Sequence, residues 1–436
     1  MVCVLTIRAV SDKELFSMKT STKLTLLIIT IALALATWLV TSWQSGQVDR
    51  IMTMMDVDRN GVIQTEELSP LMRLRISELD IDGNGDLGPS EVAAYIRSSI
   101  FNVIRHKWRA RGLPEYPDNV ERESLQVALD EMVEVLELPG AVMLVGRNGG
   151  EQIRVSSGDF DANKVVSVAS ASKWVSSAVL MRLVEQGVLT LDAPLNTYIP
   201  ELDGHWANAT LRQLLSHSSG AGPGHAIENP PSMSYRAHFE QLIQIPVKNE
   251  PGVKFSYGGI SMQIAGYIAE QASGKRWSQL FDELVATPAG MEHSTYGHPF
   301  WYSPGVEIQS PNLAGGLYAS GQDYFNFLTA VSADGMERRL LTEDSTGQME
   351  SDQTSTLVHH SERGPLPEDW FYGLGLWCES PLEGRCTKIN SAGAFGTFPW
   401  IDRKSGTYGV LVTMGSLAEV MPFALNLRRL AIELER

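Results

Sequence analysis

The hydrophobic residues of this chain recur with different periods along its length. From Glu121 to Leu138 apolar residues recur at helical spacing, which predicts an amphipathic helix. Residues 140–146 form a short apolar run, and a second strand is expected at residues 152–156, after the Asn-Gly-Gly turn at 148–150. Together the two strands predict a β-hairpin.

The amino-terminal region has a longer apolar run. Residues 24–40 are an uncharged stretch of 17 residues, and with the residues up to Trp43 they are just long enough to cross a bilayer as a helix. The preceding Lys13, Lys19 and Lys23 favour a cytoplasmic amino terminus and export of everything after Trp43. The pattern predicts a single-pass protein of the bacterial inner membrane with everything after the apolar run in the periplasm or outside, and a cytoplasmic tail and anchor at residues 1–23 and 24–43.

Two alternatives to the anchor remain open. Small residues at positions 32, 34 and 36 offer weak cleavage-like patterns, so the run could be a signal peptide and the protein would then be secreted. A buried core helix is the other alternative, although the run lacks the periodic polar face of such a helix. The position of the small residues inside the run favours the uncleaved anchor.

One motif occurs twice. Residues 56–67 and 80–91 both match the EF-hand calcium loop, with Gly61 and Gly85 at the sharp turn. Calcium is a hard cation that takes about six to eight oxygen ligands, and the loop supplies them at fixed positions that end in a bidentate glutamate. The predicted ligands are Asp56, Asp58, Asn60, Val62 (through its carbonyl) and Glu67 in the first loop, and Asp80, Asp82, Asn84, Asp86 and Glu91 in the second.

Calcium at these loops can serve several roles. Calcium is abundant outside the cytoplasm, so even weak sites would stay filled, and a structural role is favoured. A calcium switch on the enzyme and a dockerin-like grip on a partner protein are alternatives, as are two acidic turns that bind no metal. Dockerin modules, however, lack the final glutamate that Glu67 and Glu91 supply.

The composition fits an enzyme. The chain has 436 residues, 43% hydrophobic and 20% charged, which is ordinary for a folded protein of more than one domain. Its formal net charge of −16 repels phosphate backbones, so no nucleic-acid partner is expected. Of three cysteines, Cys378 and Cys386 are the one close pair, which could form a disulfide in an oxidising compartment or remain two thiols.

A linker separates two folded parts. Prolines at 114 and 117 cannot continue the helical pattern that precedes them. The expected domains are an EF-hand pair at residues 49–108, a linker at 109–119 and a catalytic domain at 120–436.

A Ser-x-x-Lys sequence at the start of a predicted helix is the main candidate for chemistry. Ser170 and Lys173 are three residues apart, so they share one helix face and the amine can reach the hydroxyl. A serine hydroxyl is a poor nucleophile until a base takes its proton. Lysine acts as that base only when neutral, a form that burial among the following apolar residues favours. Taken alone the motif is weak, because a capped helix with a surface lysine has the same sequence.

Further phrases follow it in a fixed order. They are Leu-Val-Glu-Gln-Gly-Val-Leu-Thr-Leu-Asp-Ala-Pro-Leu-Asn at 183–196, Leu-Arg-Gln-Leu-Leu-Ser-His-Ser-Ser-Gly at 211–220, Pro-Gly-Val-Lys-Phe-Ser-Tyr-Gly-Gly at 251–259, Leu-Ala-Gly-Gly-Leu-Tyr-Ala-Ser at 313–320, Tyr-Gly-Leu-Gly-Leu-Trp at 372–377 and Ser-Ala-Gly-Ala-Phe-Gly-Thr-Phe-Pro-Trp-Ile-Asp at 391–402. By these phrases the chain from residue 120 to 436 resembles the class C β-lactamase-related serine hydrolases, a family of β-lactamases, penicillin-binding proteins and esterases.

The resemblance implies an α+β fold. It consists of an antiparallel sheet flanked by helices, with a helical subdomain inserted after the Ser-x-x-Lys helix. In this chain a small all-α EF-hand pair and one transmembrane helix would precede it. The pattern of the chain is compatible with this fold, since residues 140–156 and 389–415 are strand-rich whereas residues 171–187 and 260–288 look helical.

The resemblance also implies residue roles. Ser170 would be the acylated nucleophile, Lys173 its base, and Tyr257 the group that relays protons to the leaving group and from the hydrolytic water. The backbone amides of Ser170 and Ala394 would form the oxyanion hole.

Two further positions would lie close to that site. Ser391 and Gly393, in the triplet just before Ala394, would line the substrate-binding site. His217 invites comparison with a Ser-His-Asp triad, but the resemblance implies a structural role for its turn. We find no cluster with zinc-ligand spacing, so no catalytic metal is expected.

Two departures from the family pattern affect specificity. The family's Tyr-x-Asn reads Tyr257-Gly258-Gly259, and the triplet that usually starts with Lys or His starts with Ser391. The missing charge commonly pairs with a substrate carboxylate, and where that contact is buried its loss should weaken binding of β-lactams and D-alanyl-D-alanine ends by a few kcal/mol. The sequence therefore favours hydrolysis of esters or small amides. The alternatives are a non-catalytic penicillin-binding-like receptor and a true β-lactamase or D-amino-acid peptidase.

Overall fold

The structure is a computed structural model in which residues 48–49, 52, 60–64, 80–94, 122–148, 150–222, 233–247, 249–298, 308–332, 339–359, 366–367, 369–379, 381–382 and 384–434 are described. The predicted tail, the apolar run at 24–43 and the linker at 109–119 lie outside these residues. Within the described ranges, no helix has both the length and the apolar character needed to cross a bilayer.

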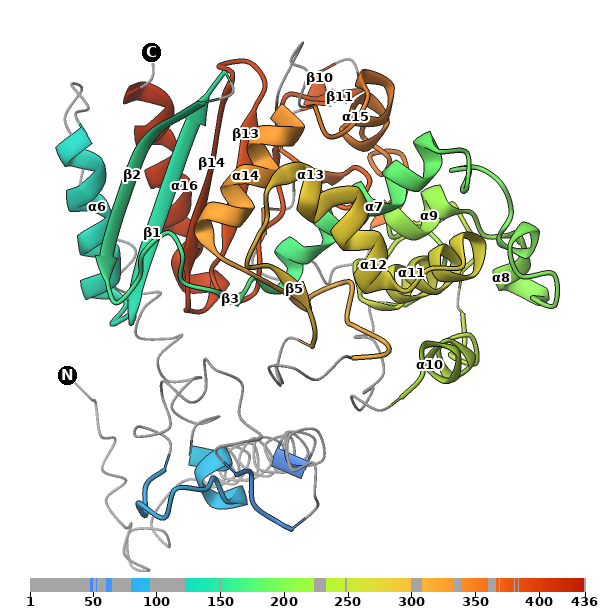
Figure 1. Cartoon of the computed structure of the whole chain (residues 1–436), viewed down its shortest axis with the longest axis horizontal. Coiled ribbons are helices and arrows are strands. Elements are labelled where there is room, and N and C mark those ends of the chain that lie inside the picture. The colour runs from blue at the N-terminus through green and yellow to red at the C-terminus, as the bar shows by residue number, and fades with distance from the viewer. Residues whose placement is uncertain are drawn as a thin grey trace, which may run out of the picture.

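A seven-stranded antiparallel sheet lies at the centre of the catalytic domain. Its strands are β1 (Gly140–Arg147), β2 (Gly150–Gly158), β8 (Phe371–Tyr372), β9 (Trp377–Cys378), β12 (Lys388–Asn390), β13 (Phe398–Asp402) and β14 (Thr407–Thr413). They lie in the order β2-β1-β14-β13-β12-β9-β8 (Figure 1). β1 and β2 form the predicted hairpin, and β1 pairs on its other side with β14, the last strand among the described residues.

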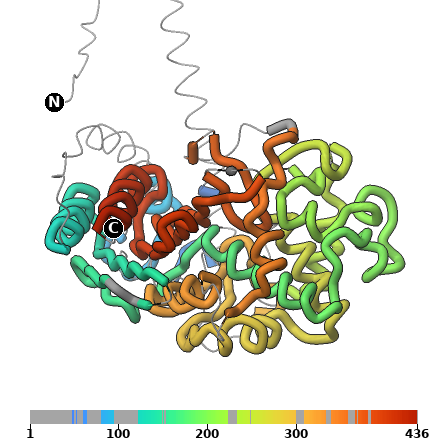
Figure 2. Tube along the Cα trace, turned by 90° about the horizontal axis from the view of Figure 1, so that it is seen from above, coloured from blue at the N-terminus to red at the C-terminus, as the bar shows by residue number. Residues whose placement is uncertain are grey.

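Both faces of this sheet are buried, because successive side chains of a strand point to opposite faces. In β1, the odd-numbered residues from Ala141 to Val145 belong to one hydrophobic core, and Val142 and Leu144 belong to the other. In Figure 2 the sheet lies between the first and last helices of the domain on one side and an orange helix on the other. These three helices are α6 (Arg122–Val135), α16 (Leu417–Leu434) and α14 (Gly321–Ser332).

The remaining helices form the helical part of the domain, beside the sheet (Figure 1). They are α7 (Ser172–Glu185), α8 (Gly204–Asn208), α9 (Leu211–Leu215), α10 (Tyr235–Leu242), α11 (Ile260–Ser273), α12 (Trp277–Phe281), α13 (Thr287–Ala289) and α15 (Glu343–Met349), with 3-10 turns η2 (Ala169–Ala171) and η3 (Leu195–Thr197) and the π-turn η4 (Asp282–Ala286). The α+β class predicted from the family resemblance is confirmed.

Short strands complete the domain and fix its loops. β3 (Val166–Ser167) pairs with β6 (Leu317–Ala319), which also pairs with β5 (Thr295–Tyr296), and this small sheet leads the chain into η2. Two further pairs are β4 (Lys254–Phe255) with β7 (Val358–His359), and β10 (Pro381–Leu382) with β11 (Arg385–Cys386). The structure joins Cys378 of β9 to Cys386 of β11 in a disulfide, which the sequence left open.

Candidate active site

Ser170 lies in a tight turn between β3 and α7. The residue before it, Ala169, has a φ of +47°, a left-handed conformation that is uncommon for a residue with a Cβ. The hydroxyl of Ser172 holds this turn, because it donates to the Ala169 carbonyl at 2.6 Å and accepts from the backbone N–H of Leu317 at 3.0 Å. The small β3–β6 sheet and the start of α7 thus fix the predicted nucleophile together.

The Lys173 amine is directed at Ser170. Its side chain is buried on the first turn of α7, and Nζ lies 3.0 Å from Ser170 Oγ. Nζ also donates to the carbonyl oxygen of Ala314 at 2.7 Å, 141 residues along the chain. Sequence reasoning did not assign this acceptor, although Ala314 belongs to the Leu-Ala-Gly-Gly phrase that carries part of the family resemblance.

Tyr257 joins the same group. The centroid of its ring lies 4.6 Å from Lys173 Nζ, and the ring packs at 5.1 Å from that of Trp377. Tyr372 lies edge-on to it at 5.8 Å, and burial, with Tyr257 next, raises the pKa of the Tyr372 phenol well above its usual range. Tyr372 therefore stays a neutral packing group. The structure brings Ser170, Lys173 and Tyr257 together.

The strand edge after β12 borders the Ser170 turn. Ser391 Oγ donates to the backbone oxygen of Ser170 at 3.3 Å. A Cβ on Gly393 would lie 2.1 Å from the carbonyl oxygen of Val168, so only glycine allows this approach. Among the described residues, the backbone N–H of Ala394 has no backbone acceptor, which leaves it available to a substrate oxygen.

A buried ion pair supports the strand edge that carries Ser391 and Gly393. Arg428 of α16 pairs with Glu379 through two hydrogen bonds, one of 2.7 Å, and the side chain of Asn390 donates to the same carboxylate at 2.8 Å. The Asn390 side-chain oxygen in turn accepts the backbone N–H of Ala392 at 3.2 Å. Sequence reasoning missed this network, and no local pattern signals a pair 49 residues apart.

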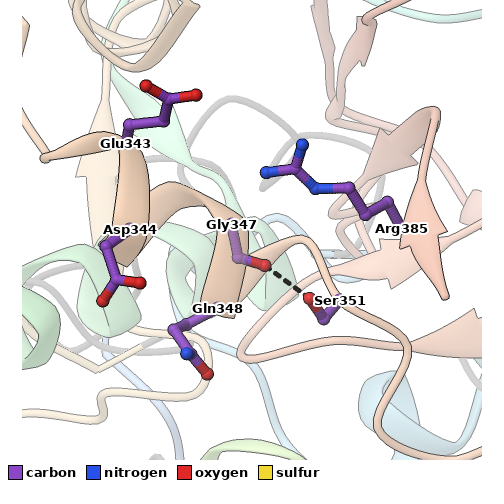
Figure 3. A pocket seen from close by; sticks show the side chains of 6 residues that line it. All are labelled: Glu343, Asp344, Gly347, Gln348, Ser351 and Arg385. Carbon is purple, nitrogen blue, oxygen red and sulfur yellow. Dashed lines mark hydrogen bonds between the residues drawn. The ribbon is translucent and has the colours of Figure 1, made fainter.

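A surface pocket of about 440 Å³ lies at α15 and β11. In Figure 3 its polar side chains come from both elements, and Ser351 Oγ donates to the Gly347 carbonyl. None of its lining residues is a predicted site residue. The full lining is Glu343, Asp344, Gly347, Gln348, Ser351 and Arg385.

The second predicted calcium loop is described, and its oxygens gather at one point. Carboxylate oxygens of Asp80, Asp82 and Glu91 lie within 4.8 Å of one another. Glu91 is buried, and its two oxygens accept backbone N–H groups from Ile81 at 2.7 Å and Gly88 at 2.8 Å, which turns the last loop residue back over the first. These hard oxygen donors fit calcium. Asn84 and Asp86 belong to the same loop.

Only part of the first loop is described. Ile63 and Leu87, the eighth residues of the two loops, form an antiparallel bridge with N···O distances of 2.9 and 2.8 Å, and both are buried. The bridge sets the two loops side by side. Asn60 and Val62 are described, whereas the predicted ligands Asp56, Asp58 and Glu67 lie outside the described residues.

The fold and the Ser-Lys pair define a serine hydrolase with the β-lactamase fold. Residues 126–432 match the Beta-lactamase family, so the chain belongs to that family.

Relatives of this chain are named for different activities. Esterase EstB of Burkholderia gladioli is 24% identical over 66% of this chain and 89% of EstB. The D-alanyl-D-alanine-carboxypeptidase/endopeptidase AmpH of Escherichia coli is 27% identical over 54% of this chain and 66% of AmpH. A Bacteroides dorei structure described as a candidate beta-lactamase is 29% identical, with a TM-score of 0.63 over 71% of this chain and 98% of that one.

One further structure shows the fold alone. EstCE1, a hydrolase with promiscuous acyltransferase activity, has a TM-score of 0.59 at 18% identity and covers 71% of this chain and 99% of its own.

Proposed function

We propose that this protein hydrolyses esters or small amides outside the cytoplasm through an acyl-enzyme on Ser170. The observation that carries the proposal is the 3.0 Å approach of the Lys173 amine to Ser170 Oγ, with the Tyr257 ring beside the amine. A base within hydrogen-bond reach of a serine is the arrangement that activates it for attack on a carbonyl carbon.

The reaction follows from these positions. Lys173 takes the proton of Ser170 as Oγ bonds to the carbonyl carbon, and the N–H groups of Ser170 and Ala394 stabilise the resulting oxyanion. The C–O or C–N bond of the substrate then breaks, and the leaving group takes a proton through the Tyr257 phenol. Water attacks the acyl-enzyme by the reverse proton route, which releases the acid and restores the Ser170 hydroxyl.

The preference for substrates without a free carboxylate rests on Ser391. This residue stands where a Lys or His would offer a charge, and its hydroxyl is directed to the backbone of Ser170 instead. A β-lactam or a D-alanyl-D-alanine end would leave its carboxylate without a charged partner in the triplet. Among the relatives, a protein named as an esterase supports the ester preference.

The test compares labelling and turnover. Purified protein should react with a fluorophosphonate probe and should cleave short-chain p-nitrophenyl esters faster than a chromogenic cephalosporin. Ser170→Ala should lose the label and the esterase activity, whereas Ser278→Ala, which replaces an exposed serine on α12, should keep both. A wild-type protein that takes no label would favour the penicillin-binding-like receptor, and faster cephalosporin cleavage would favour the true β-lactamase.

We also propose that both EF-hand loops bind calcium in a structural role. The gathered carboxylates of Asp80, Asp82 and Glu91 support this, as does the bridge that joins the two loops. A sensor or docking role for the loops is the alternative.

Export of the catalytic domain is a proposal as well. The Cys378–Cys386 disulfide is the kind of bond that persists in oxidising compartments, which agrees with an inner-membrane anchor at residues 24–43 and a catalytic domain in the periplasm.

A further inference from the structure

His217 combines three unfavourable features in one residue. Its φ of +54° lies in the left-handed region that residues with a side chain seldom adopt. Its side chain is buried, with 1% of the residue exposed. Neither ring nitrogen has a hydrogen-bond partner among the described residues, and buried polar atoms without partners are rare in folded proteins. Such features persist where the surrounding structure imposes them, and they gather at functional sites.

The turn that carries His217 does not need this imidazole. Backbone bonds hold it, since Ser256 N–H donates to the His217 carbonyl at 2.8 Å and Gly252 N–H donates to the Ser218 carbonyl at 2.7 Å. On its outer side His205 Nε2 lies 2.6 Å from the carbonyl oxygen of Ser219. The turn therefore positions the imidazole, and the imidazole does not hold the turn together.

The imidazole packs against the predicted proton relay. Its ring centroid lies 4.8 Å from that of Tyr257 and 5.0 Å from that of Tyr372, tilted by about 60° to both. Phe255 lies edge-on at 6.3 Å and completes the apolar wall. Burial, with the adjacent Lys173 amine, holds the pKa of His217 well below its usual range, so the ring stays neutral. The imidazole therefore contributes shape and no charge to the site.

We propose that His217 is a positioning residue, whose ring forms one wall of the slot that fixes the Tyr257 phenol against Lys173. The inference rests on the proposed acyl-enzyme mechanism and assigns His217 to the step in which Tyr257 protonates the leaving group. A structural residue of the turn would have no such selective effect. The shared backbone bond between His217 and Ser256, the residue before Tyr257, adds a second link between them.

The experiment uses two esters of one acid, p-nitrophenyl butyrate and ethyl butyrate. A nitrophenolate leaves without protonation, whereas an ethoxide requires it, so the ratio of their kcat/KM values reports on the proton relay. His217→Asn removes the ring and keeps a side chain that tolerates left-handed backbone. It should lower kcat/KM for ethyl butyrate about tenfold more than for p-nitrophenyl butyrate. Labelling by a fluorophosphonate, whose fluoride leaves unaided, should stay near the wild-type rate.

Tyr257→Phe should shift the ratio in the same direction. The double variant should add little to Tyr257→Phe, because both substitutions disable one step. His205→Ala, which loosens the same turn without contact to Tyr257, is the matched control and should lower the melting temperature with the ratio unchanged. Where His217→Asn yields no soluble protein, His217→Gln serves the same comparison.

Two outcomes would overturn the proposal. One is an equal fall for both esters in the His217 variant, which a merely structural role predicts, and the other is a full additional loss in the double variant. Failure of the proposed function is recognised separately, since wild-type protein would then take no fluorophosphonate label.

Discussion

In the proposed mechanism, the side chain at position 391 sets the charge offered to a substrate beside the Ser170 turn. Ser391→Lys would place an ammonium in the triplet position where relatives of this family carry Lys or His. A charge-assisted hydrogen bond to a carboxylate is worth about 1.5–3 kcal/mol, so kcat/KM for a chromogenic cephalosporin should rise by roughly tenfold or more. Activity on p-nitrophenyl butyrate should fall or stay level.

Ser391→Met, of similar length and no charge, is the control for this change. If Ser391→Lys does not raise kcat/KM for the cephalosporin, residue 391 does not face the substrate carboxylate. The argument for ester preference would then lose its basis.

At the residue scale, the sequence predicts the members of the site better than it predicts their support. Ser170 and Lys173 follow from a three-residue spacing, and Tyr257 follows only from its place in the family phrases. The Ala314 carbonyl on Lys173 and the Glu379–Arg428 pair join residues far apart in the chain, and a local pattern holds no information on such pairs.

At the scale of the elements, the loop within residues 372–377 packs closely against helix α7. Gly375 has a φ of +82°, and a Cβ there would lie 1.9 Å from Ser177 Oγ and 2.8 Å from the Lys173 carbonyl oxygen. Gly375→Ala should therefore push α7 out of place and lower the free energy of unfolding by about 2 kcal/mol or more, with a loss of activity. Urea denaturation and esterase assays measure the two effects.

Gly187→Ala is the matched control for Gly375→Ala. Gly187 has a φ of +70°, and no atom lies within 4 Å of the position that a Cβ would take, so its substitution carries the backbone strain alone. It should cost about 1 kcal/mol and leave activity intact. Equal effects of the two substitutions would argue that contact with α7 is unimportant.

The disulfide ties β9 to β11 across a separation of eight residues. In the chain-entropy account, closing so short a loop stabilises the folded state by about 2.5 kcal/mol. The double variant Cys378→Ala with Cys386→Ala should have a free energy of unfolding, measured by urea denaturation, that is lower by the same amount. A reducing agent should destabilise the wild type and leave the double variant unchanged, and an equal response of both would indicate two thiols.

At the element scale, the amphipathic helix and hairpin at the start of the domain match the structure. The helix has an unbroken helical period, and the apolar run of the first strand ends at a clear turn signal. The helical stretch at 260–288 is helical but in pieces, since Gly274 takes a φ of +70° and ends α11. Apolar residues continue across that break, so periodicity alone does not reveal it.

For the molecule as a whole, calcium is expected to set the stability of the predicted EF-hand part. An ion present at about 100 times its dissociation constant stabilises the bound fold by about 2.7 kcal/mol. Removal of calcium with a chelator should lower the melting temperature of one calorimetric transition, and Glu91→Gln should reduce that response. Glu433→Gln, at the far end of the chain, is the control.

Esterase activity separates the two roles of calcium. Unchanged activity after chelation, with the catalytic domain still folded, agrees with a structural role, whereas a loss of activity would favour a calcium switch. The sequence predicts the loops at this scale because their ligand spacing is local, but it offers no pattern from which the coupling between the two parts follows.

The pairing of β1 with β14 has a consequence for biosynthesis. Ala141 lies opposite Thr413 in the sheet, so the second neighbouring strand of β1 is synthesised long after β1 itself. Until β14 is synthesised, the edge of β1 that faces away from β2 has no paired strand, and the sheet of the nascent domain cannot form completely. A chain that stops short of this strand would expose that edge to other chains, which makes premature termination a route to aggregation.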